Sequence, residues 1–379
     1  MKITGGKVFD LNQGFVERDV CFDGALITPD SRDDASYDAA GCYVIPGLTD
    51  VHFHGCRGAD LSDGDPEGLQ TMAEYELSRG VTQICPAGMT LLEDRLMQVC
   101  RTAAAHKKAN KPGADLVGIN LEGPFLSLAK KGAQNGDWLH APDAAMLRRL
   151  MEASEGLVKL VSVAPEEPGA LDFIRDVAEE VNVSVAHTTA NYDTALEAFR
   201  CGAREVTHLF NAMPAFTHRA PGVVGAALDS PWARVELISD GIHIHPSVVR
   251  AVFKMFGADR VVLISDTMRA AGMSDGEYDL GGQNVIVKGP LATLADGTIA
   301  GSVTDLMACM VRAVSFGIPL ADAVRAAAVN PAQAIGIFDR VGSLEPGKRA
   351  NAAILDENLE LKAVFFHGKL VDTSSGSLA

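Results

Sequence analysis

Short apolar runs alternate with longer stretches of helical periodicity through the middle of the chain. The apolar runs that read as strands are eight in number: 48–54, 80–87, 115–123, 158–166, 182–189, 205–212, 234–241 and 260–267. Most are apolar on both faces, which is typical of parallel strands enclosed within a sheet. Stretches such as 66–80, 93–110 and 191–202 lie between them and have the periodicity of amphipathic helices. This alternation predicts an α/β fold with a closed (β/α)8 TIM-like barrel.

The two ends of the chain carry a different pattern, in which short β-like runs are broken by Gly, Asn and Asp. Segments 1–47 and 338–379 are therefore expected to pair as one small, discontinuous β-sandwich domain beside a barrel domain at 48–337. Residues 270–302 are rich in Gly and Asp and predict a hairpin region inserted near the barrel mouth. A doubly wound open sheet is the alternative, but it favours a Gly-rich turn where this chain has histidines.

Composition places the chain among soluble globular proteins, since 47% of its 379 residues are hydrophobic and 22% are charged. The formal net charge of −16 disfavours nucleic acid and anionic membranes as partners, although one local arginine can still bind an anionic substrate. The first residues read as a strand rather than a secretory leader, and no apolar run reaches the roughly 18 residues of a membrane helix. Seven cysteines without a C-x-x-C pair favour reduced thiols and a cytoplasmic location.

Residues with metal-binding side chains close the apolar runs, at the edge where barrel enzymes place their active sites. His52 and His54 stand two residues apart on one run, so their imidazoles are expected on the same face. Other runs end in the remaining candidates: Glu122, His187, His208, Asp240 and Asp266. A single histidine there is more often a core residue with a hydrogen-bonding partner. So many at one edge would each need a separate buried partner, whereas a divalent metal would satisfy them together.

The number of candidate ligands predicts two metal ions. Five ligands are too many for one catalytic ion that keeps an open position, but they suit a pair bridged by a carboxylate and a hydroxide. No lysine ends the run at 158–166, so Glu122 is the expected bridging carboxylate. Imidazole and carboxylate ligands suit zinc first, and also iron, cobalt or manganese.

Five motifs resemble the amidohydrolase superfamily, in the order PG-x-x-D-x-H-x-H, LEGPF, AHTTA, VTHLFNAMP and LISDTM. The blocks NLEGPFLS…KKGAQN, THLFNAMPAFTHRAPGVVGAALD, ISDGIHIHP and IAGSVTDL resemble, more closely, the N-acetylglucosamine-6-phosphate deacetylase family. The resemblance covers essentially the whole chain, including both terminal β segments. The His-x-His motif is moderately specific, and the block THLFNAMP…HRAPG is highly specific.

The resemblance implies ligation of one metal by Glu122, His187 and His208. His52 and His54 would add a second metal, because some family members that lack this pair use one metal and this chain retains the pair.

The resemblance also implies that Asp266 is the general acid and base and that His243 orients the substrate. Arg219 would reach the phosphate of the substrate from the neighbouring subunit of a homodimer. The other residues that match sugar and phosphate contacts, or line the same pocket, are Ala133, Gln134, Asn211, Ala212, Asp240, Ile299, Ala300 and Gly301.

The activity implied is hydrolysis of N-acetyl-D-glucosamine 6-phosphate to D-glucosamine 6-phosphate and acetate, in amino-sugar catabolism. Metal-activated hydroxide would attack the amide, and Asp266 would transfer the proton to the departing amine. The same chemistry on the galactosamine epimer stays open. A superfamily member that hydrolyses a cyclic amide or an N-acyl amino acid would more commonly use a carboxylated lysine than Glu122. An inactive metal-binding protein would be expected to lack Asp266, which is present.

Two residues depart from the pattern of the family. Gln134 stands where some members have a histidine, so one substrate contact changes from a possible cation to a neutral amide. Arg269 stands where small residues are usual. Its guanidinium either alters sugar preference near the barrel mouth or belongs to a solvated loop residue.

Overall fold

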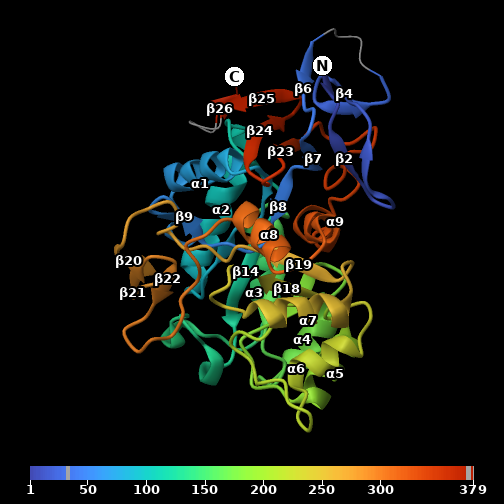
Figure 1. Ribbon diagram of the computed structural model, residues 1–379. Helices are drawn as coiled ribbons and strands as arrows, with labels where there is room; N and C mark the ends of the chain where they lie inside the picture. The colour runs from blue at the N-terminus through green and yellow to red at the C-terminus, as the bar shows by residue number, and fades with distance from the viewer. Residues whose placement is uncertain (31–34, 373–376, 379) are drawn as a thin grey trace.

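The eight apolar runs form parallel strands in the computed structural model, which describes residues 1–30, 35–372 and 377–378 (Figure 1). Their bounds are β8 (Leu48–Asp50), β11 (Val81–Ile84), β14 (Ile119–Phe125), β15 (Val158–Val163), β16 (Asn182–Val185), β17 (Glu205–Val206), β18 (Arg234–Ile238) and β19 (Val261–Ile264). Each strand from β14 to β19 pairs in parallel with the next, and β8 pairs with β11. Between β11 and β14 the short strands β12 (Ala87–Gly88) and β13 (Asp115–Leu116) continue the pairing.

Backbone hydrogen bonds beyond β8 and β19 close the sheet into a barrel. The amide of Asp266 donates to the carbonyl of His52 at 2.9 Å, and the amide of His54 donates to the carbonyl of Thr267 at 2.7 Å. The predicted (β/α)8 barrel is therefore confirmed. The first strand is shorter than predicted, because the Asp50 carboxylate accepts a local hydrogen bond from the His52 amide and ends the regular ladder. His52 and His54 thus follow β8 rather than lying within it.

Helices surround the barrel between successive strands. They are α1 (Pro66–Ser78), α2 (Glu93–Ala109), α3 (Ala144–Ala153), α4 (Ala170–Val177), α5 (Tyr192–Cys201), α6 (Gly222–Leu228), α7 (Pro246–Phe256), α8 (Leu306–Ser315), α9 (Leu320–Val324) and α10 (Asn330–Ala334). Side-chain caps start several of them; at α1 the Asp65 carboxylate accepts from the amides of Glu67 and Gly68, and Pro66 takes the first helical position. Among these described segments, no helix is long and apolar enough to cross a bilayer.

The two ends of the chain fold together, at the top of Figure 1. One sheet has the order β26-β25-β24-β23-β7-β2-β3 and the other the order β5-β4-β1-β6. Their strands are β1 (Lys2–Thr4), β2 (Lys7–Asp10), β3 (Gly14–Glu17), β4 (Val20–Asp23), β5 (Leu26–Thr28), β6 (Ser36–Asp38), β7 (Tyr43–Pro46), β23 (Ala352–Leu355), β24 (Leu361–Phe366), β25 (Lys369–Asp372) and β26 (Ser377–Leu378). The antiparallel pairing of β7 with β23 joins the N- and C-terminal segments, as predicted. Domain boundaries after residues 47 and 337 stay a prediction.

A three-stranded antiparallel sheet stands where the inserted hairpin was expected. It consists of β20 (Gly276–Leu280), β21 (Gln283–Lys288) and β22 (Leu291–Thr293), and it lies at the left of Figure 1. A hairpin of β9 (Gly55–Cys56) and β10 (Ala59–Asp60) leads into the short helical turn η1 (Leu61–Asp63). An apolar cluster of its own lies beneath the insert, and includes Met268, Leu280 and Val285. The insert is therefore packed against the loop that follows β19.

Candidate metal centre and active-site pocket

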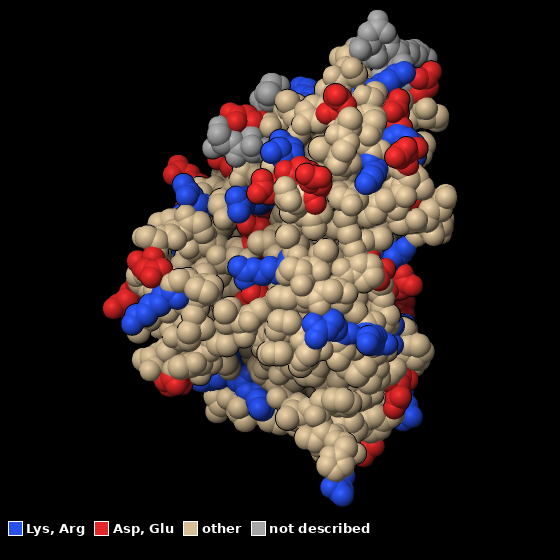
Figure 2. All heavy atoms as spheres, in the orientation of Figure 1, with Lys and Arg blue, Asp and Glu red and all other residues tan. Residues whose placement is uncertain are grey.

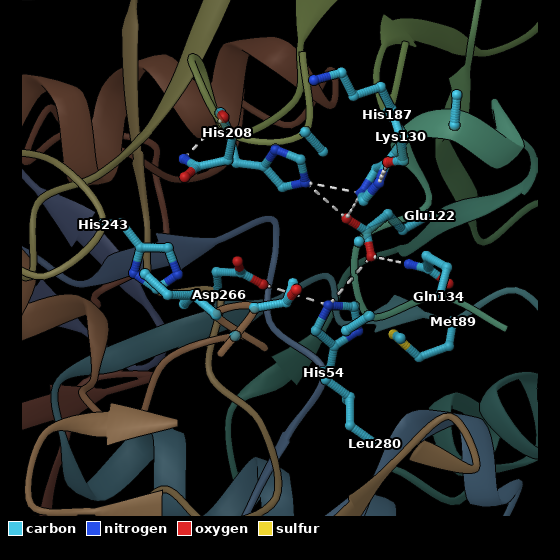
Figure 3. A pocket seen from close by; sticks show the side chains of 18 residues that line it. His54, Met89, Glu122, Lys130, Gln134, His187, His208, His243, Asp266 and Leu280 are labelled. Carbon is cyan, nitrogen blue, oxygen red and sulfur yellow. Dashed lines mark hydrogen bonds and ion pairs between the residues drawn. The ribbon is translucent and has the colours of Figure 1, made fainter. Parts of the chain in front are cut away.

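Six buried side chains meet at the carboxyl-terminal edge of the barrel strands, and Figure 3 shows the five that line the pocket: His54, Glu122, His187, His208 and Asp266. Ligand atoms of His52, His54 and Asp266 lie within 4.8 Å of one another, as do those of Glu122, His187 and His208. All six were predicted from the ends of the apolar runs. The parallel strands bring them together because their carboxyl ends share one rim of the barrel.

Glu122 on β14 connects the two groups. Its Oε1 lies 2.9 Å from Nε2 of His208 and 3.1 Å from Nε2 of His187. Its Oε2 lies 3.3 Å from Nε2 of His54 and accepts a hydrogen bond from the Gln134 amide at 2.5 Å. Oε1 also lies 3.5 Å from Nε2 of His52, so the carboxylate contacts histidines of both groups, as a bridging ligand must.

Hydrogen bonds on the outer ring nitrogens orient three of the histidines. Nδ1 of His52 lies 2.8 Å from the Glu236 carboxylate, Nδ1 of His54 lies 3.2 Å from the Ala87 carbonyl, and Nδ1 of His187 lies 2.8 Å from the carbonyl of Lys130. A carbonyl or carboxylate oxygen can only accept, so each Nδ1 carries a proton. In a neutral imidazole, Nε2 then carries no proton, and its lone pair points into the centre.

These lone pairs face carboxylate oxygens, which is unfavourable unless a cation lies between them. His52 shows the conflict most clearly, because its Nε2 is buried without a hydrogen-bond partner and lies 3.5 Å from Oε1 of Glu122. A proton is one solution: although burial opposes it, hydrogen bonds with Asp266 and Glu122 raise the pKa of His54 to about 10. A divalent metal is the other, and it displaces such protons when it binds. The described residues therefore fit a divalent metal.

The backbone is strained at the same positions. His187, His208 and Asp266 have φ values of 42°, 28° and 50°, in the left-handed region that side chains other than glycine rarely adopt. Such strain costs about 1–3 kcal/mol per residue and persists where surrounding structure enforces it, often at functional sites. The sequence offers only a weak signal for this feature, because histidine and aspartate adopt positive φ more often than most residues but do so at few of their positions.

A cavity of about 470 Å³ opens above the six side chains. The predicted contact residues that line it are Ala133, Gln134, Asn211, Ala212, His243, Ile299 and Gly301. Further lining residues that sequence reasoning missed are Met89, Ala129, Lys130, Gly132, Leu280 and Thr298. They lie on loops, on a short helical turn and on the insert; the sequence predicts the insert near the barrel mouth, but not which of its residues reach the pocket.

Comparison with known proteins agrees with this geometry. The profile of the amidohydrolase family matches residues 43–371. The chain belongs to the amidohydrolase family. It is 36% identical to the N-acetylglucosamine-6-phosphate deacetylase of Bacillus subtilis (strain 168), over 87% of this chain and 85% of that protein. It is 34% identical to the N-acetylgalactosamine-6-phosphate deacetylase of Escherichia coli O157:H7, over 86% and 87%.

A solved structure resembles this amidohydrolase along nearly its whole length. It is a mutant of N-acetyl-D-glucosamine-6-phosphate deacetylase from Mycobacterium smegmatis in complex with N-acetyl-D-glucosamine-6-phosphate. The TM-score is 0.90 and the sequence identity is 32%, with 98% of each chain covered. The barrel and the terminal β-sandwich are thus shared with a deacetylase of known structure.

Three predicted contact residues of the amidohydrolase lie off the wall of its own pocket. Asp240 lies beneath His243, and its carboxylate accepts a hydrogen bond from Nδ1 of His243 at 2.8 Å. Ala300 is fully buried between two residues that do line the pocket. Arg219 lies on the exposed loop before α6, where its guanidinium contacts the ring of His218. Asp240 therefore orients His243 rather than lining the pocket. Arg219 is not among the described residues that line the pocket of its own subunit.

Glu236 on β18 is a functional candidate that sequence reasoning missed, although it is a buried acid within an apolar run. Its carboxylate binds Nδ1 of His52 and accepts a hydrogen bond from the backbone amide of His208 at 3.1 Å. We expect Glu236→Gln to weaken metal affinity by about 10- to 100-fold, the usual effect of losing a partner behind a ligating histidine. Titration against a chelator measures this, with Glu152→Gln on the exposed face of α3 as the control. Unchanged affinity would contradict the orienting role.

Proposed function

We propose that this amidohydrolase deacetylates N-acetyl-D-glucosamine 6-phosphate, releasing D-glucosamine 6-phosphate and acetate in amino-sugar catabolism. The observation that carries the proposal is that Glu122 links its own group of buried side chains to the group that contains His52, His54 and Asp266, at the base of the pocket. The relatives at 36% and 34% identity are named for deacetylation of amino-sugar phosphates, which supports this reaction class. Glu122, rather than a lysine, at the centre weighs against the cyclic-amide hydrolases.

The metal in this proposal is a pair of divalent ions, with zinc first and iron, cobalt or manganese as alternatives. Glu122, His187 and His208 would hold one ion, and His52 and His54 would hold the other together with Glu122. When bound, the ions supply a hydroxide nucleophile near neutral pH and polarise the carbonyl of the amide.

Asp266 is suited to accept a proton and then release it. Burial would raise the pKa of Asp266, but a hydrogen bond from His54 and the charge of His52 hold it below its usual value. Bound metal ions would replace the positive charge of those imidazoles, so the carboxylate would again be ionised when the reaction begins. It takes the proton of the attacking nucleophile and delivers it to the amine nitrogen as the C–N bond breaks.

His243 holds the sugar in this proposal. Asp240 fixes Nδ1 of His243, which leaves Nε2 as the atom available to the pocket. Burial opposes the charged form, but the hydrogen bond and charge of Asp240 raise the pKa of His243. A donor that is charged in this way suits the hydroxyl, carbonyl and phosphate oxygens of the substrate.

Acetate release from a panel of phosphorylated N-acetyl sugars tests the proposal. We expect kcat/KM to be highest for N-acetyl-D-glucosamine 6-phosphate and to fall by at least about tenfold without the phosphate, as for loss of a charge-assisted contact. The Escherichia coli relative makes the galactosamine epimer the second candidate, and preference for that epimer would select it. Hydrolysis of cyclic amides or N-acyl amino acids alone would overturn both.

The number of bound metal ions is a separate prediction. Metal-saturated protein should contain two divalent ions per chain by elemental analysis, and replacing His52 and His54 with alanine should lower the ratio to one. Replacing His106 on α2 and His367 in the turn between β24 and β25 is the matched control. A ratio near one in the unaltered protein, unaffected by loss of the pair, would assign His52 and His54 a structural role.

A homodimer is also part of the proposal, with Arg219 of each subunit contacting the substrate phosphate in the other. Arg219 is the only Lys or Arg from residue 207 to residue 228. Its loop projects at the lower end of Figure 1, where Figure 2 shows a positively charged tip. Phe216 in the same loop is 43% exposed, as a side chain that packs against a partner would be in a single subunit.

The remaining part of the proposal concerns location and other partners. A cytoplasmic location is supported by the seven cysteines, which all lie in the described residues and form no disulfide. The net charge of −16 supports the absence of nucleic acid and of membrane surfaces among its partners.

A further inference from the structure

Arg269 connects the catalytic side of the barrel with the insert. It follows Asp266 by three residues, and its side chain is 15% exposed. Its Nη2 lies 2.9 Å from Oδ1 of Asp63 and 3.6 Å from Oδ1 of Asp279, and the Asp60 carboxylate is 3.9 Å away. Asp60 caps the start of η1 and Asp63 is its last residue, whereas Asp279 belongs to β20. One guanidinium thus joins segment 60–63 to the insert and to the loop after β19, and it is not the solvated loop residue that the sequence left open.

The insert that Arg269 joins to the barrel forms one wall of the pocket. Leu280, next to Asp279, is buried and lines the cavity together with Met89. The two residues belong to the same apolar cluster. Gly281 packs closely on Met89, since a Cβ at that position would lie 3.2 Å from the terminal methyl of Met89. A small rotation of the insert would therefore move the apolar wall.

The wall lies at the end of the pocket where the amide would react. Figure 3 shows Met89 and Leu280 on the His54 side of the cavity, away from Lys130 and His208. Nε2 of His54 lies 3.3 Å from Asp266, the proposed proton carrier. An amide in the cavity above His54 and Asp266 would lie beside Met89 and Leu280, so its acyl carbon chain could face this apolar surface rather than the polar rim.

We propose that Arg269 is a positioning residue that fixes the insert, so that Leu280 and Met89 form a rigid wall that limits the acyl group to acetyl. The inference rests on the proposed function and adds to it the part of the substrate that the insert selects. One additional methylene in a close-fitting apolar pocket changes kcat/KM by about 10- to 200-fold, but only where the wall cannot move. The ion pairs of Arg269 supply that rigidity, since they bind the insert to η1 and to the segment after β19.

The test compares N-acetyl-, N-propionyl- and N-butyryl-glucosamine 6-phosphate as substrates. Leu280→Ala should lower the acetyl-to-butyryl ratio of kcat/KM by at least about tenfold, because it removes methyl groups from the wall. Arg269→Ala and Asp279→Asn should lower the same ratio by at least about threefold, since each removes one side of the clamp. Arg204→Ala, at the opposite end of the barrel, is the control. A ratio within one preparation is insensitive to the fraction of folded protein.

Hydrogen exchange of the insert provides a readout that is independent of activity. Residues 276–293 should exchange faster in Arg269→Ala than in Arg204→Ala. Unchanged exchange would overturn the proposal that the ion pairs of Arg269 fix the insert. The acetyl-to-butyryl ratio of kcat/KM could instead stay within about twofold of the unaltered protein in both Leu280→Ala and Arg269→Ala. That result would overturn the role of the wall in selecting the acyl group, because one methylene in a rigid pocket changes kcat/KM by more than twofold. Failure of the unaltered protein to hydrolyse any of these amides would instead overturn the proposed function, so the two failures are distinguishable.

Discussion

Asp266→Asn is expected to reduce turnover of N-acetyl-D-glucosamine 6-phosphate by at least about a hundredfold, the scale of losing a general acid and base. An amide of the same shape keeps an oxygen beside His54 but cannot take up and release a proton at neutral pH. The fold and the metal content should persist, because the proposed ligands are Glu122 and the four histidines, which the substitution leaves in place. Steady-state kinetics, elemental analysis and circular dichroism of the metal-loaded variant measure these three properties.

The control for this variant is Asp94→Asn, which makes the same chemical change on the exposed surface of α2. Its turnover should match that of the unaltered protein. Acetate release by metal-loaded Asp266→Asn at a near-normal rate would remove Asp266 from the proton-transfer role. The proposal would then need another group to carry the proton, and His243 on the pocket wall is a candidate.

The barrel could be predicted because its strands are encoded locally. Each apolar run buries both faces, so the pattern along 158–166 or 234–241 is visible without any knowledge of neighbouring strands. The end of the first strand could not be placed as well. The regular strand pairing stops where the Asp50 carboxylate accepts a hydrogen bond from the His52 amide. The position of that stop depends on the backbone hydrogen bonds that close the barrel between the segments after β8 and β19.

The candidate metal ligands could be predicted for a similar reason. In a parallel barrel a polar residue at the end of an apolar run reaches the same rim as its counterparts on other strands, so sequence position is enough. The residues that hydrogen-bond to the candidate ligands and orient them could not be predicted in this way. Glu236 contacts His52 across 184 positions of sequence, and its value as an orienting group depends on a distance that no local pattern encodes.

The two departures from the family pattern have different outcomes in the structure. Gln134 lines the pocket, but its amide is already engaged: Nε2 donates to Glu122, and Oε1 accepts from the Thr90 amide at 2.7 Å. Arg269 lies outside the pocket lining and pairs with acids on other segments. Only long-range packing could distinguish a residue in the pocket from one that supports its wall.

Arg219→Ala is expected to raise KM for the phosphorylated substrate by about 10- to 100-fold, the effect of losing a charge-assisted hydrogen bond to a phosphate dianion. KM for unphosphorylated N-acetylglucosamine should change little, because the lost partner is absent from that substrate. Arg204→Ala again removes a surface arginine at the far end of the barrel and should leave both values unchanged. Equal effects on both substrates would indicate a general disturbance of the pocket rather than loss of a phosphate contact.

Mixed dimers distinguish an arginine that acts across the interface from one that acts within its own chain. Arg219→Ala and Asp266→Asn subunits, once exchanged, place an intact Asp266 and a neighbour's intact Arg219 in one of the two sites of each mixed dimer. Random exchange should therefore restore about a quarter of the full site activity, measured at substrate well below the raised KM. An arginine that served its own chain would leave every site with one defect, and mixing would restore nothing. Activity that stays at the sum of the separate variants, despite exchange demonstrated by mass spectrometry, would refute the shared site.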